Sequence, residues 1–363
     1  MKVIHNVSLK PYNTFGIDVR ASKFIKIQTI EDLKKILRKT YAEELFILGG
    51  GSNMLLTGDI HKTVLQIDLK GKEVLEVKDD YAIIKAHAGE NWHEFVTLCM
   101  EEKWYGFENL ALIPGSVGAC PIQNIGAYGR EVNALIDKVE CVLLETGEQV
   151  LLNKEDCQFG YRDSVFKHAL ANKVLITHVN FKLPKDYELE TSYGELAALS
   201  EPTPEKVYSK VIEIRKSKLP DPNVLGNAGS FFKNPVVPTS VFHSIQKDYD
   251  VVPHFVITNK VTPPTETSDL GVTLKQQDNT KQNEELIKIP AAWLIDQAGF
   301  KGKTLNKVRC HPTQPLVLTN LGGATGEDLI TMAKNIIASV HDKFGVTLEP
   351  EVRLLGSKGL ISL

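Results

Sequence analysis

The sequence predicts an α+β protein of two or three compact units, and three observations support this prediction. The chain has 363 residues, whereas a single domain ordinarily has roughly 150. Alternating hydrophobic patterns typical of strands recur through its first half. Patterns with the helical period of 3.6 residues lie between them and again near the C-terminus, which indicates a mixed architecture.

The first third is expected to form strands interrupted by glycine. Residues 44–48 (ELFIL) lead directly into a glycine cluster, and residues 63–69 show a second strand pattern. Apolar segments on both sides of Asp79 and Asp80 indicate a hairpin.

A helix is predicted over 91–104, followed by further strands. Asn91 and Glu94 have the spacing of a capping box, and the apolar residues after them share one face. Alternating patterns at 138–144 and 174–183 predict two strands. Together with the preceding segments they form a mixed α+β unit.

A domain boundary is expected after the next helix. Thr203 and Pro204 supply its cap and first-turn proline, and residues 219–222 (LPDP) end it. Residues 258–285 are polar, contain two prolines and lack periodicity, so they predict a long surface loop.

The strongest helical pattern covers 325–344. Its apolar residues form one stripe, and Gly345 provides the stop. Residues 346–355 (VTLEPEVRLL) alternate as a strand that would place Glu349, Glu351 and Arg353 on one face.

Composition and charge exclude several classes of protein. Hydrophobic residues make up 42% and charged residues 24%, and the net charge of −3 provides no basic field for nucleic acid. The N-terminus lacks a secretory signal pattern, and no apolar run reaches membrane-spanning length. We therefore expect a cytoplasmic protein without nucleic-acid or membrane partners.

The cysteines and histidines predict neither disulfides nor a metal site. The five cysteines are far apart and contain no C-x-x-C pair. No two histidines have metal-ligand spacing, so a lone residue such as His93 or His311 is expected on the surface or in a hydrogen bond.

Two glycine clusters are candidates for binding phosphate. GGGSN at 49–53 directly follows a predicted strand, and PGSVGA at 114–119 is soon followed by QNIGAYG at 123–129. Glycine allows successive backbone N–H groups to converge on an anion, so two such loops could hold a pyrophosphate from both sides. Each cluster alone fits a tight turn equally well, and neither matches G-x-G-x-x-G, which argues against a Rossmann domain.

Individual polar residues leave a chemical and a structural interpretation open. Arg162, in GYRDS, could bind a carboxylate in bidentate fashion, but an ion pair with Asp163 is favoured without further context. Glu351 and Arg353 also fit a solvated strand face. Ser230 lies in GNAGSFFKNP, which lacks the G-x-S-x-G of a nucleophile elbow, so its hydroxyl is a candidate proton donor.

The order of the motifs is more informative than any one of them. In chain order they are NTFGI at 13–17, LGGGSNMLL at 48–56, IPGSVGACPIQNIGAYG at 113–129, GYRDS at 160–164, KLPDP at 218–222, GNAGSFFKNP at 226–235, AAWLIDQAGFKG at 291–302 and LEPEVRLLG at 348–356. Together they resemble the UDP-N-acetylenolpyruvoylglucosamine reductase family, also called UDP-N-acetylmuramate dehydrogenases, in the form that has a tyrosine loop. The resemblance spans nearly the whole chain.

The resemblance implies an FAD-binding fold of the vanillyl-alcohol oxidase type, made of two α+β subdomains, with a third α+β domain that binds substrate. The subdomains would cover residues 1–70 and 71–216, and the substrate-binding domain residues 217–344. The C-terminal segment 345–363 would join the first subdomain. Both glycine loops would hold the pyrophosphate of FAD.

The same resemblance implies an activity. FAD would pass hydride from NADPH to UDP-N-acetylglucosamine enolpyruvate, giving UDP-N-acetylmuramate for peptidoglycan synthesis. Ser230 would protonate the carbon next to the one that accepts hydride. Arg162 and Glu351 would flank the substrate carboxylate, Glu351 protonated or bridged through a proton, and stabilise the developing charge. The expected partners are the UDP-sugar and NADPH, bound by a monomer.

The resemblance also assigns binding positions. The cofactor-binding positions are Gly49, Gly50, Gly51, Ser52, Asn53, Pro114, Gly115, Ser116, Gly118, Ala119, Asn124, Ile125, Gly126, Tyr128 and Arg215. The substrate-binding positions are Tyr161, Tyr193, Lys218, Asn234, Gln297 and Arg353. Tyr193 lies in SYGE, which matches the tyrosine loop, and Lys218 suits the diphosphate of UDP.

Two other functions remain open at this level. One is an FAD-dependent oxidase of the same fold, which often attaches FAD covalently through His, Cys or Tyr; the glycine loops contain no histidine, which leaves Cys120. The other is a nucleotide-sugar binding or regulatory protein without catalysis. The presence of Ser230, Arg162 and Glu351 together argues against it.

Overall fold

The structure is a computed structural model that describes residues 2–257, 286–357 and 359–363. It comprises two compact units: unit 1 is Met1–Val224 with Leu354–Ser362, and unit 2 is Leu225–Arg353 with Leu363. The domain boundaries expected at 216/217 and 344/345 stay predictions. The division of unit 1 into two subdomains stays a prediction, and the loop expected at 258–285 lies outside the described residues.

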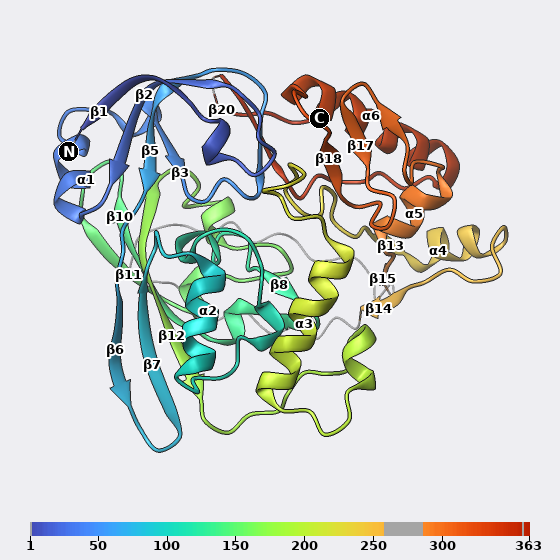
Figure 1. Ribbon diagram of the computed structural model, residues 1–363, viewed down its shortest axis with the longest axis horizontal. Coiled ribbons are helices and arrows are strands. Elements are labelled where there is room, and N and C mark those ends of the chain that lie inside the picture. The colour runs from blue at the N-terminus through green and yellow to red at the C-terminus, as the bar shows by residue number, and fades with distance from the viewer. Residues whose placement is uncertain (1, 258–285, 358) are drawn as a thin grey trace. The chain divides into compact units, whose positions relative to one another are not determined.

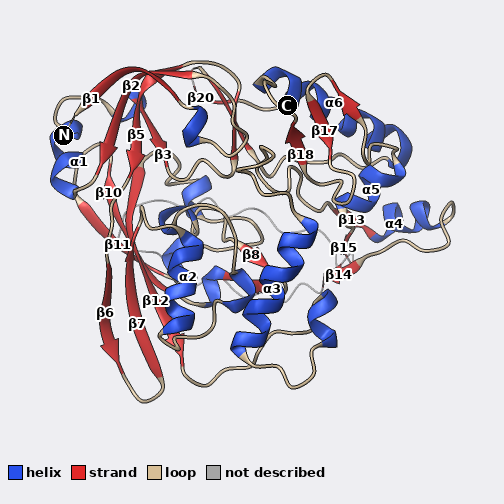
Figure 2. Ribbon diagram, viewed as in Figure 1, coloured by secondary structure: helices blue, strands red, loops and turns tan. Residues whose placement is uncertain are grey.

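Unit 1 is built on two main sheets (Figures 1 and 2). The first has the order β1-β2-β5-β3, with β1 (Val3–Ser8), β2 (Arg20–Ile27), β3 (Leu45–Leu48) and β5 (Ile60–Ile67). The second has the order β11-β10-β12-β7-β6, with β6 (Lys72–Val77), β7 (Tyr81–His87), β10 (Ile136–Leu143), β11 (Gln149–Asn153) and β12 (Val174–Pro184). The predicted strands and the hairpin around Asp79 and Asp80 are confirmed.

Strand β5 pairs in parallel with both β2 and β3, and α1 (Ile30–Leu37) connects β2 to β3. The described pairs of the second sheet are antiparallel. Short 3-10 helices complete the unit: η1 (Lys10–Tyr12), η2 (Ala42–Glu44), η3 (Glu108–Leu110), η4 (Val117–Ala119), η5 (Val132–Ala134), η6 (Glu155–Cys157), η7 (Val165–Lys167) and η8 (Gly194–Ala198).

Helix α2 (Trp92–Glu101) lies next to the second sheet, and α3 (Pro204–Lys218) lies on the other side of α2, away from the sheet (Figure 1). Their apolar faces belong to one core cluster with β12, in which the rings of Phe107 and Phe181 are 5.1 Å apart. The predicted N-caps are confirmed, since the side chain of Asn91 accepts from Glu94 N–H at 3.1 Å and that of Thr203 from Lys206 N–H at 3.3 Å.

Helix α2 ends at Glu101 rather than at the predicted Trp104. Lys103 adopts a left-handed conformation with φ of 60°, and the N–H of Trp104 turns back to the carbonyl of Cys99 at 2.7 Å. This turn satisfies a terminal carbonyl and stops the helix.

In its described residues, unit 2 combines two small sheets with three helices. The sheets contain β13 (Val236–Pro238), β14 (Phe255–Ile257) and β15 (Leu286–Lys288), and β16 (Thr304–Leu305), β17 (Val308–Cys310) and β18 (Leu318–Asn320). The helices are α4 (Thr239–Gln246), α5 (Ala291–Gln297) and α6 (Gly326–Phe344). The long C-terminal helix is confirmed as α6, with a capping box between Thr325 and Asp328 and Gly345 at φ of +67° as its stop. No helix in the described ranges has the length and apolar composition needed to cross a membrane.

The strand predicted over 346–355 is wrong in its first part. Strand β19 covers only Arg353–Gly356 and pairs with β20 (Gly359–Leu360) and β4 (Met54–Leu56). Pro350 has no N–H to donate, so a regular ladder of hydrogen bonds cannot continue through it. Pro350 instead makes an isolated bridge with Phe232. Through β4, residues 354–362 belong to unit 1. A further pair, β8 (Gly126–Ala127) and β9 (Arg130–Glu131), follows the second glycine cluster.

Candidate active site

The first glycine loop, residues 49–53, connects β3 to β4. Gly51 has a φ of +62°, and a Cβ there would lie 2.0 Å from the carbonyl oxygen of Tyr12, so a side chain cannot be accommodated. The carbonyl of Gly51 accepts from Thr14 N–H at 3.1 Å. Asn13, from NTFGI, closes the preceding turn by accepting from Ile17 N–H at 2.9 Å. The NTFGI motif therefore supports the first loop.

The second glycine loop, residues 114–119, is held against the end of β7. The N–H of Val117 donates to the carbonyl of Glu90, and the N–H of Gly118 to that of Ala88, both at 2.9 Å. A Cβ on Gly118 would lie 2.5 Å from the Cβ of Ala88. Gly118 is therefore required by packing, whether or not a ligand is bound.

The two loops meet within unit 1. A Cβ on Gly50 would lie 3.0 Å from the Cα of Gly115, and a Cβ on Gly115 would lie 2.8 Å from Ser52 Oγ. Ser52 Oγ donates to the carbonyl of Pro114 at 3.0 Å. Glycine is favoured at position 50 because the two backbones approach so closely, and it is required at position 115 because φ there is +124°.

Backbone N–H groups of both loops remain available to a ligand. Within the described part of the chain, no hydrogen-bond acceptor is present for the N–H groups of Gly50, Gly51, Ser52, Gly115 and Ser116. Successive backbone N–H groups of this kind form a concavity that binds anions. Because the groups come from two abutting loops, they fit a diphosphate.

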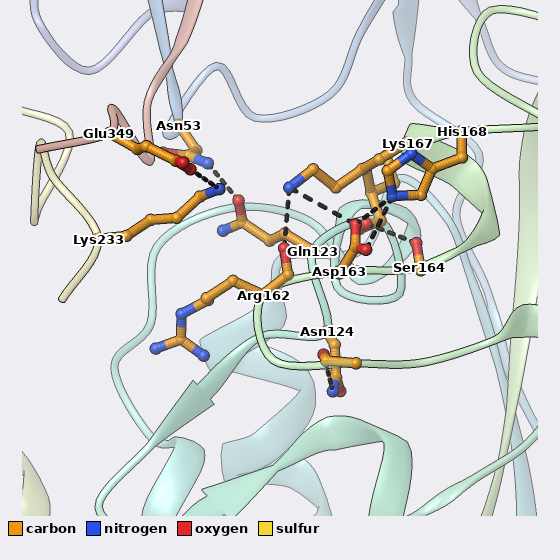
Figure 3. Close-up of polar contacts among 12 residues, drawn as sticks. Asn53, Gln123, Asn124, Arg162, Asp163, Ser164, Lys167, His168, Lys233 and Glu349 are labelled. Carbon is orange, nitrogen blue, oxygen red and sulfur yellow. Dashed lines mark hydrogen bonds and ion pairs between the residues drawn. The ribbon is translucent and has the colours of Figure 1, made fainter. Parts of the chain in front are cut away.

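The segment after the second loop is fixed by Asn124. This residue is buried with φ of 43°, and its side chain donates to Glu131 Oε2 at 2.8 Å and to the carbonyl of Gly160 at 3.0 Å. Its Oδ1 accepts from Asn133 N–H at 3.1 Å. The Asn124 side chain is thus committed to the protein, and a cofactor contact there would use the backbone. The side-chain amides of Asn53 and Gln123 also form a hydrogen bond (Figure 3).

Arg162 lies in a tight turn over 160–163. Gly160 and Asp163 exchange backbone hydrogen bonds at 3.0 and 3.2 Å, and Arg162 has a φ of 54°, which is uncommon for a residue with a Cβ. Its Nη2 donates to the carbonyl of Gly126 at 2.6 Å, and its guanidinium carbon lies 5.5 Å from the ring centroid of Tyr161. The turn therefore places Arg162 and Tyr161 together beside residues 123–129.

Asp163, the alternative partner considered for Arg162, forms ion pairs with its other neighbours. His168 Nε2 lies 2.8 Å from its carboxylate and Lys167 Nζ lies 3.9 Å from it. Figure 3 shows the Arg162 side chain directed away from this group.

A polar cluster beside the second loop contains four predicted residues. Burial raises the pKa of Tyr128 and lowers the pKa of Arg215, and the Tyr128 hydroxyl partly offsets the second effect. The rings of Tyr128 and Tyr193 meet edge to face with centroids 6.1 Å apart. Lys218 Nζ lies 2.6 Å from Glu195 Oε1, which lowers the pKa of Glu195. Glu195 could not be identified from the sequence because a single glutamate carries no pattern.

Asn109 connects residues 123–129 to Glu190, just before the tyrosine loop, and it too could not be identified from the sequence. Its Nδ2 donates to the carbonyls of Tyr128 and Glu190, both at 2.8 Å. The residue is fully buried, and its Oδ1 has no partner among the described residues. Its position in ENL offers no motif from which this role could be inferred.

In unit 2, Ser230 lies on an extended segment between two others. Ser230 forms an isolated bridge with Val317, and Phe231 N–H donates to the carbonyl of Leu316 at 2.7 Å. On the other side, Glu351 N–H donates to the carbonyl of Phe231 at 2.8 Å. The backbone thus ties Glu351 to the residue next to Ser230, and both side chains are half-buried.

The residues that flank Ser230 in GNAGSFFKNP have structural roles. Gly229 has a φ of +69°, and its N–H donates to Asn227 Oδ1 at 2.9 Å. Phe231 and Phe232 are fully buried with ring centroids 5.0 Å apart. Glycine and asparagine make the turn and the two aromatics anchor it, so Ser230 is the polar side chain held between them.

The remaining predicted residues of unit 2 have structural contacts as well. Asn234 Oδ1 accepts from Ala291 N–H at 2.9 Å and so caps the start of α5. Gln297 lies at the end of that helix, and its carbonyl accepts from Lys343 Nζ at 2.6 Å. Burial lowers the pKa of Arg353.

Lys233 lies three residues after Ser230 and forms an ion pair. Its Nζ is 3.1 Å from Glu349 Oε2 (Figure 3), and its N–H donates to the carbonyl of Glu349 at 2.9 Å.

The predicted catalytic residues are divided between the units. Arg162 belongs to unit 1, and Ser230 and Glu351 belong to unit 2. The predicted substrate contacts are divided in the same way, with Tyr161, Tyr193 and Lys218 in unit 1 and Asn234, Gln297 and Arg353 in unit 2.

The described residues contain no group of three or more His, Cys, Asp or Glu side chains placed to hold a metal ion. Cys120, the candidate for covalent attachment of a flavin, is buried. Burial raises the pKa of its thiol well above the ordinary value, so the nucleophilic thiolate is disfavoured.

Comparison with known proteins first identifies the class. Residues 21–153 match the model of an FAD binding domain, which contains the first glycine loop and the second. A solved UDP-N-acetylenolpyruvylglucosamine reductase from Thermus caldophilus has the same fold, with a TM-score of 0.65 at 20% identity over 98% of this chain and 99% of that one. The chain is thus an FAD-binding protein, and the expected α+β fold is confirmed.

The family follows from two further matches. Residues 221–355 match the C-terminal domain of UDP-N-acetylenolpyruvoylglucosamine reductase. The reductase of Pseudoalteromonas atlantica is 43% identical over 98% of this chain and 96% of its own length, and that of Flavobacterium johnsoniae is 42% identical over 98% and 100%. The chain belongs to the UDP-N-acetylenolpyruvoylglucosamine reductase family, and the predicted flavin-dependent oxidoreductase is confirmed.

Proposed function

We propose that this protein reduces UDP-N-acetylglucosamine enolpyruvate to UDP-N-acetylmuramate with NADPH, a step in making peptidoglycan precursors. The observation that supports the cofactor site is the close meeting of two glycine loops with free N–H groups, at Gly50 and Gly115. Bound FAD supplies the chemistry of hydride transfer between nicotinamide and the enol ether. The residues of both loops would hold its pyrophosphate.

Ser230 is proposed as the proton donor. Hydride added to the terminal CH₂ of the enolpyruvyl group converts it to CH₃ and leaves an electron pair at the adjacent carbon. The Ser230 O–H then donates its proton to that carbon, which completes the reduction. The proton of the hydroxyl is replaced from solvent. A side chain held by backbone pairing on both flanks suits this role, since proton transfer requires a fixed geometry.

Arg162 and Glu351 are proposed to stabilise the charge that develops on the substrate carboxylate. A guanidinium anchored at Gly126 supplies fixed positive charge without reorganisation during the reaction. Glu351 contributes by sharing a proton with the developing enol. Its backbone bond to Phe231 keeps it beside the Ser230 segment.

The substrate contacts are proposed residue by residue. Lys218 would bind the UDP diphosphate and Tyr193 would close over the nucleotide, with Tyr161, Asn234, Gln297 and Arg353 as further contacts. The side chain of Asn234 already caps α5, so it would offer its amide nitrogen to the ligand. UDP-sugars and NADPH are intracellular metabolites, so the proposed location is the cytoplasm, and the chain is proposed to act as a monomer without nucleic-acid partners.

Isotope labelling tests the proposed function. With NADPH deuterated at the transferred position in H₂O, no deuterium is expected on the carbon next to the methyl group, because that carbon takes its proton from Ser230. With unlabelled NADPH in D₂O, deuterium is expected on that carbon, because Ser230 exchanges with solvent. Mass spectrometry and NMR of the product locate the label. No NADPH-dependent conversion, or transfer of deuterium from NADPH to the carbon next to the methyl group, would contradict the proposal.

A further inference from the structure

Leu112, just before the second glycine loop, has a conformation that leucine rarely adopts. Its φ is 57°, in the left-handed region, where the Cβ of an L-residue is crowded. Two side chains from different helices hold its peptide groups. The N–H of Leu112 donates to His93 Nδ1 at 3.1 Å, and its carbonyl accepts from Arg215 Nε at 3.3 Å.

These contacts lie at the entrance to the loop that carries Gly115 and Ser116. If Leu112 relaxed to an ordinary φ, the direction of the chain entering Pro114 would change. The orientation of the N–H groups of the loop would change with it. Strained residues persist only where surrounding contacts over-determine them. Here the surrounding contacts are the hydrogen bonds from α2 and α3.

We propose that His93 is a positioning residue of the FAD site: its unprotonated Nδ1, together with Arg215, holds Leu112 in the left-handed conformation and so sets the path of the second glycine loop. His93 acts through Leu112 and not by touching the cofactor. The inference rests on the proposed function in one respect, namely that this loop binds FAD.

The surroundings of His93 keep it neutral. It lies on α2 and faces Arg215, Lys216 and the ring of Tyr208 on α3, the ring centroids being 6.2 Å apart. Burial lowers its pKa below the ordinary 6.5, the charges of Lys216 and Arg215 lower it further, and Glu94 on its own helix opposes them. Neutral His93 offers Nδ1 as an acceptor, whereas the protonated ring would direct an N–H at the N–H of Leu112.

The pH dependence follows from the direction of the shift. Because the pKa of His93 is lowered in the folded protein, its hydrogen bond with Leu112 N–H is complete above pH 6.5. The hydrogen bond is lost as the pH falls through this lowered pKa. FAD retention is therefore expected to be full at about pH 8 and to weaken as the pH falls below that lowered pKa.

Release of FAD from the holoenzyme after dilution, followed by the rise in flavin fluorescence, tests the proposal. His93→Leu removes the acceptor and is expected to release FAD about tenfold faster at about pH 8. His93→Asn keeps an acceptor oxygen near the position of Nδ1 without titrating. It is expected to match the wild type at about pH 8 and to lose the acid-dependent release.

Two matched substitutions of Leu112 distinguish the effect of its backbone conformation from the effect of its side-chain packing. Leu112→Gly and Leu112→Ala both remove the leucine side chain, but only glycine adopts the left-handed region without strain. In the His93→Leu background, Leu112→Gly is expected to restore slow release, whereas Leu112→Ala is not.

Three results would overturn the inference: unchanged release from His93→Leu, an acid-dependent release in His93→Asn equal to that of the wild type, or equal release from the two double variants. If His93→Leu does not fold, the His93→Asn profile still decides the matter. A wild type that does not bind FAD at all would instead contradict the proposed cofactor site.

Discussion

Replacing Ser230 with alanine is expected to leave reduction of the flavin by NADPH intact and to slow its reoxidation by the enolpyruvyl substrate about 10²–10⁴-fold. Only the proton donor is removed. The bridge between residue 230 and Val317, and the hydrogen bonds of Phe231, involve the backbone and remain. Stopped-flow absorbance of the flavin, with NADPH and substrate added in separate anaerobic steps, measures the two half-reactions independently.

Ser240→Ala provides the matched control, because Ser240 is an exposed serine on α4 of the same unit. It is expected to leave both half-reactions unchanged. If Ser230→Ala were reoxidised by substrate as fast as the wild type, Ser230 could not be the proton donor.

Replacing Gly50 with alanine is expected to weaken FAD binding about 100-fold or more, because at least two hydrogen bonds to a charged group would be lost at about 1.5–3 kcal/mol each. The new methyl would lie 3.0 Å from the Cα of Gly115, which is backbone and cannot rotate away. One loop must therefore move by a few tenths of an ångström, which misaligns the N–H groups of the two loops. The flavin content of the purified protein and the dissociation constant for FAD measure the effect.

Gly58→Ala is the control for this substitution. Gly58 lies between β4 and β5 of the same unit, and a Cβ there would meet nothing within 4 Å. It is expected to retain FAD normally. Normal retention in Gly50→Ala as well would show that the meeting of the two loops is not needed for the cofactor.

Local signals in the sequence were sufficient for several helix boundaries, although not for the end of α2. The side chains of Asn91, Thr203 and Thr325 accept hydrogen bonds from N–H groups three residues later, and Gly345 stops α6 with a positive φ. Such contacts depend only on residues that are close in the chain, so they can be predicted without knowledge of the tertiary structure.

The geometry of the site could not be derived in this way. Gly50 and Gly115 are far apart in the chain, and each cluster alone was equally consistent with a simple turn. Their close approach, which leaves only 3.0 Å between a Cβ added to Gly50 and the Cα of Gly115, is a property of the folded unit. The order of motifs supplied the family, but Asn109, Leu112 and Glu195 carry no pattern of their own, and only the structure shows what they contact.

The prediction of a strand over 346–352 was wrong because pairing, too, depends on the folded structure. Residues 346–352 do alternate between exposed and buried side chains for much of their length, as the pattern predicted. Alternation reports which side of an extended chain is buried, whereas a strand also needs a partner and an N–H at each pairing position. Pro350 lacks that N–H, so the segment is extended without a regular ladder.

The most direct measurement is the visible absorption spectrum of the purified protein through two anaerobic additions. NADPH is expected to bleach the flavin band, and UDP-N-acetylglucosamine enolpyruvate is expected to restore it without oxygen. Recovery with the enolpyruvyl compound would establish both half-reactions in one protein. A flavin that NADPH bleaches but that recovers only when oxygen is admitted would contradict the reductase and favour an oxidase.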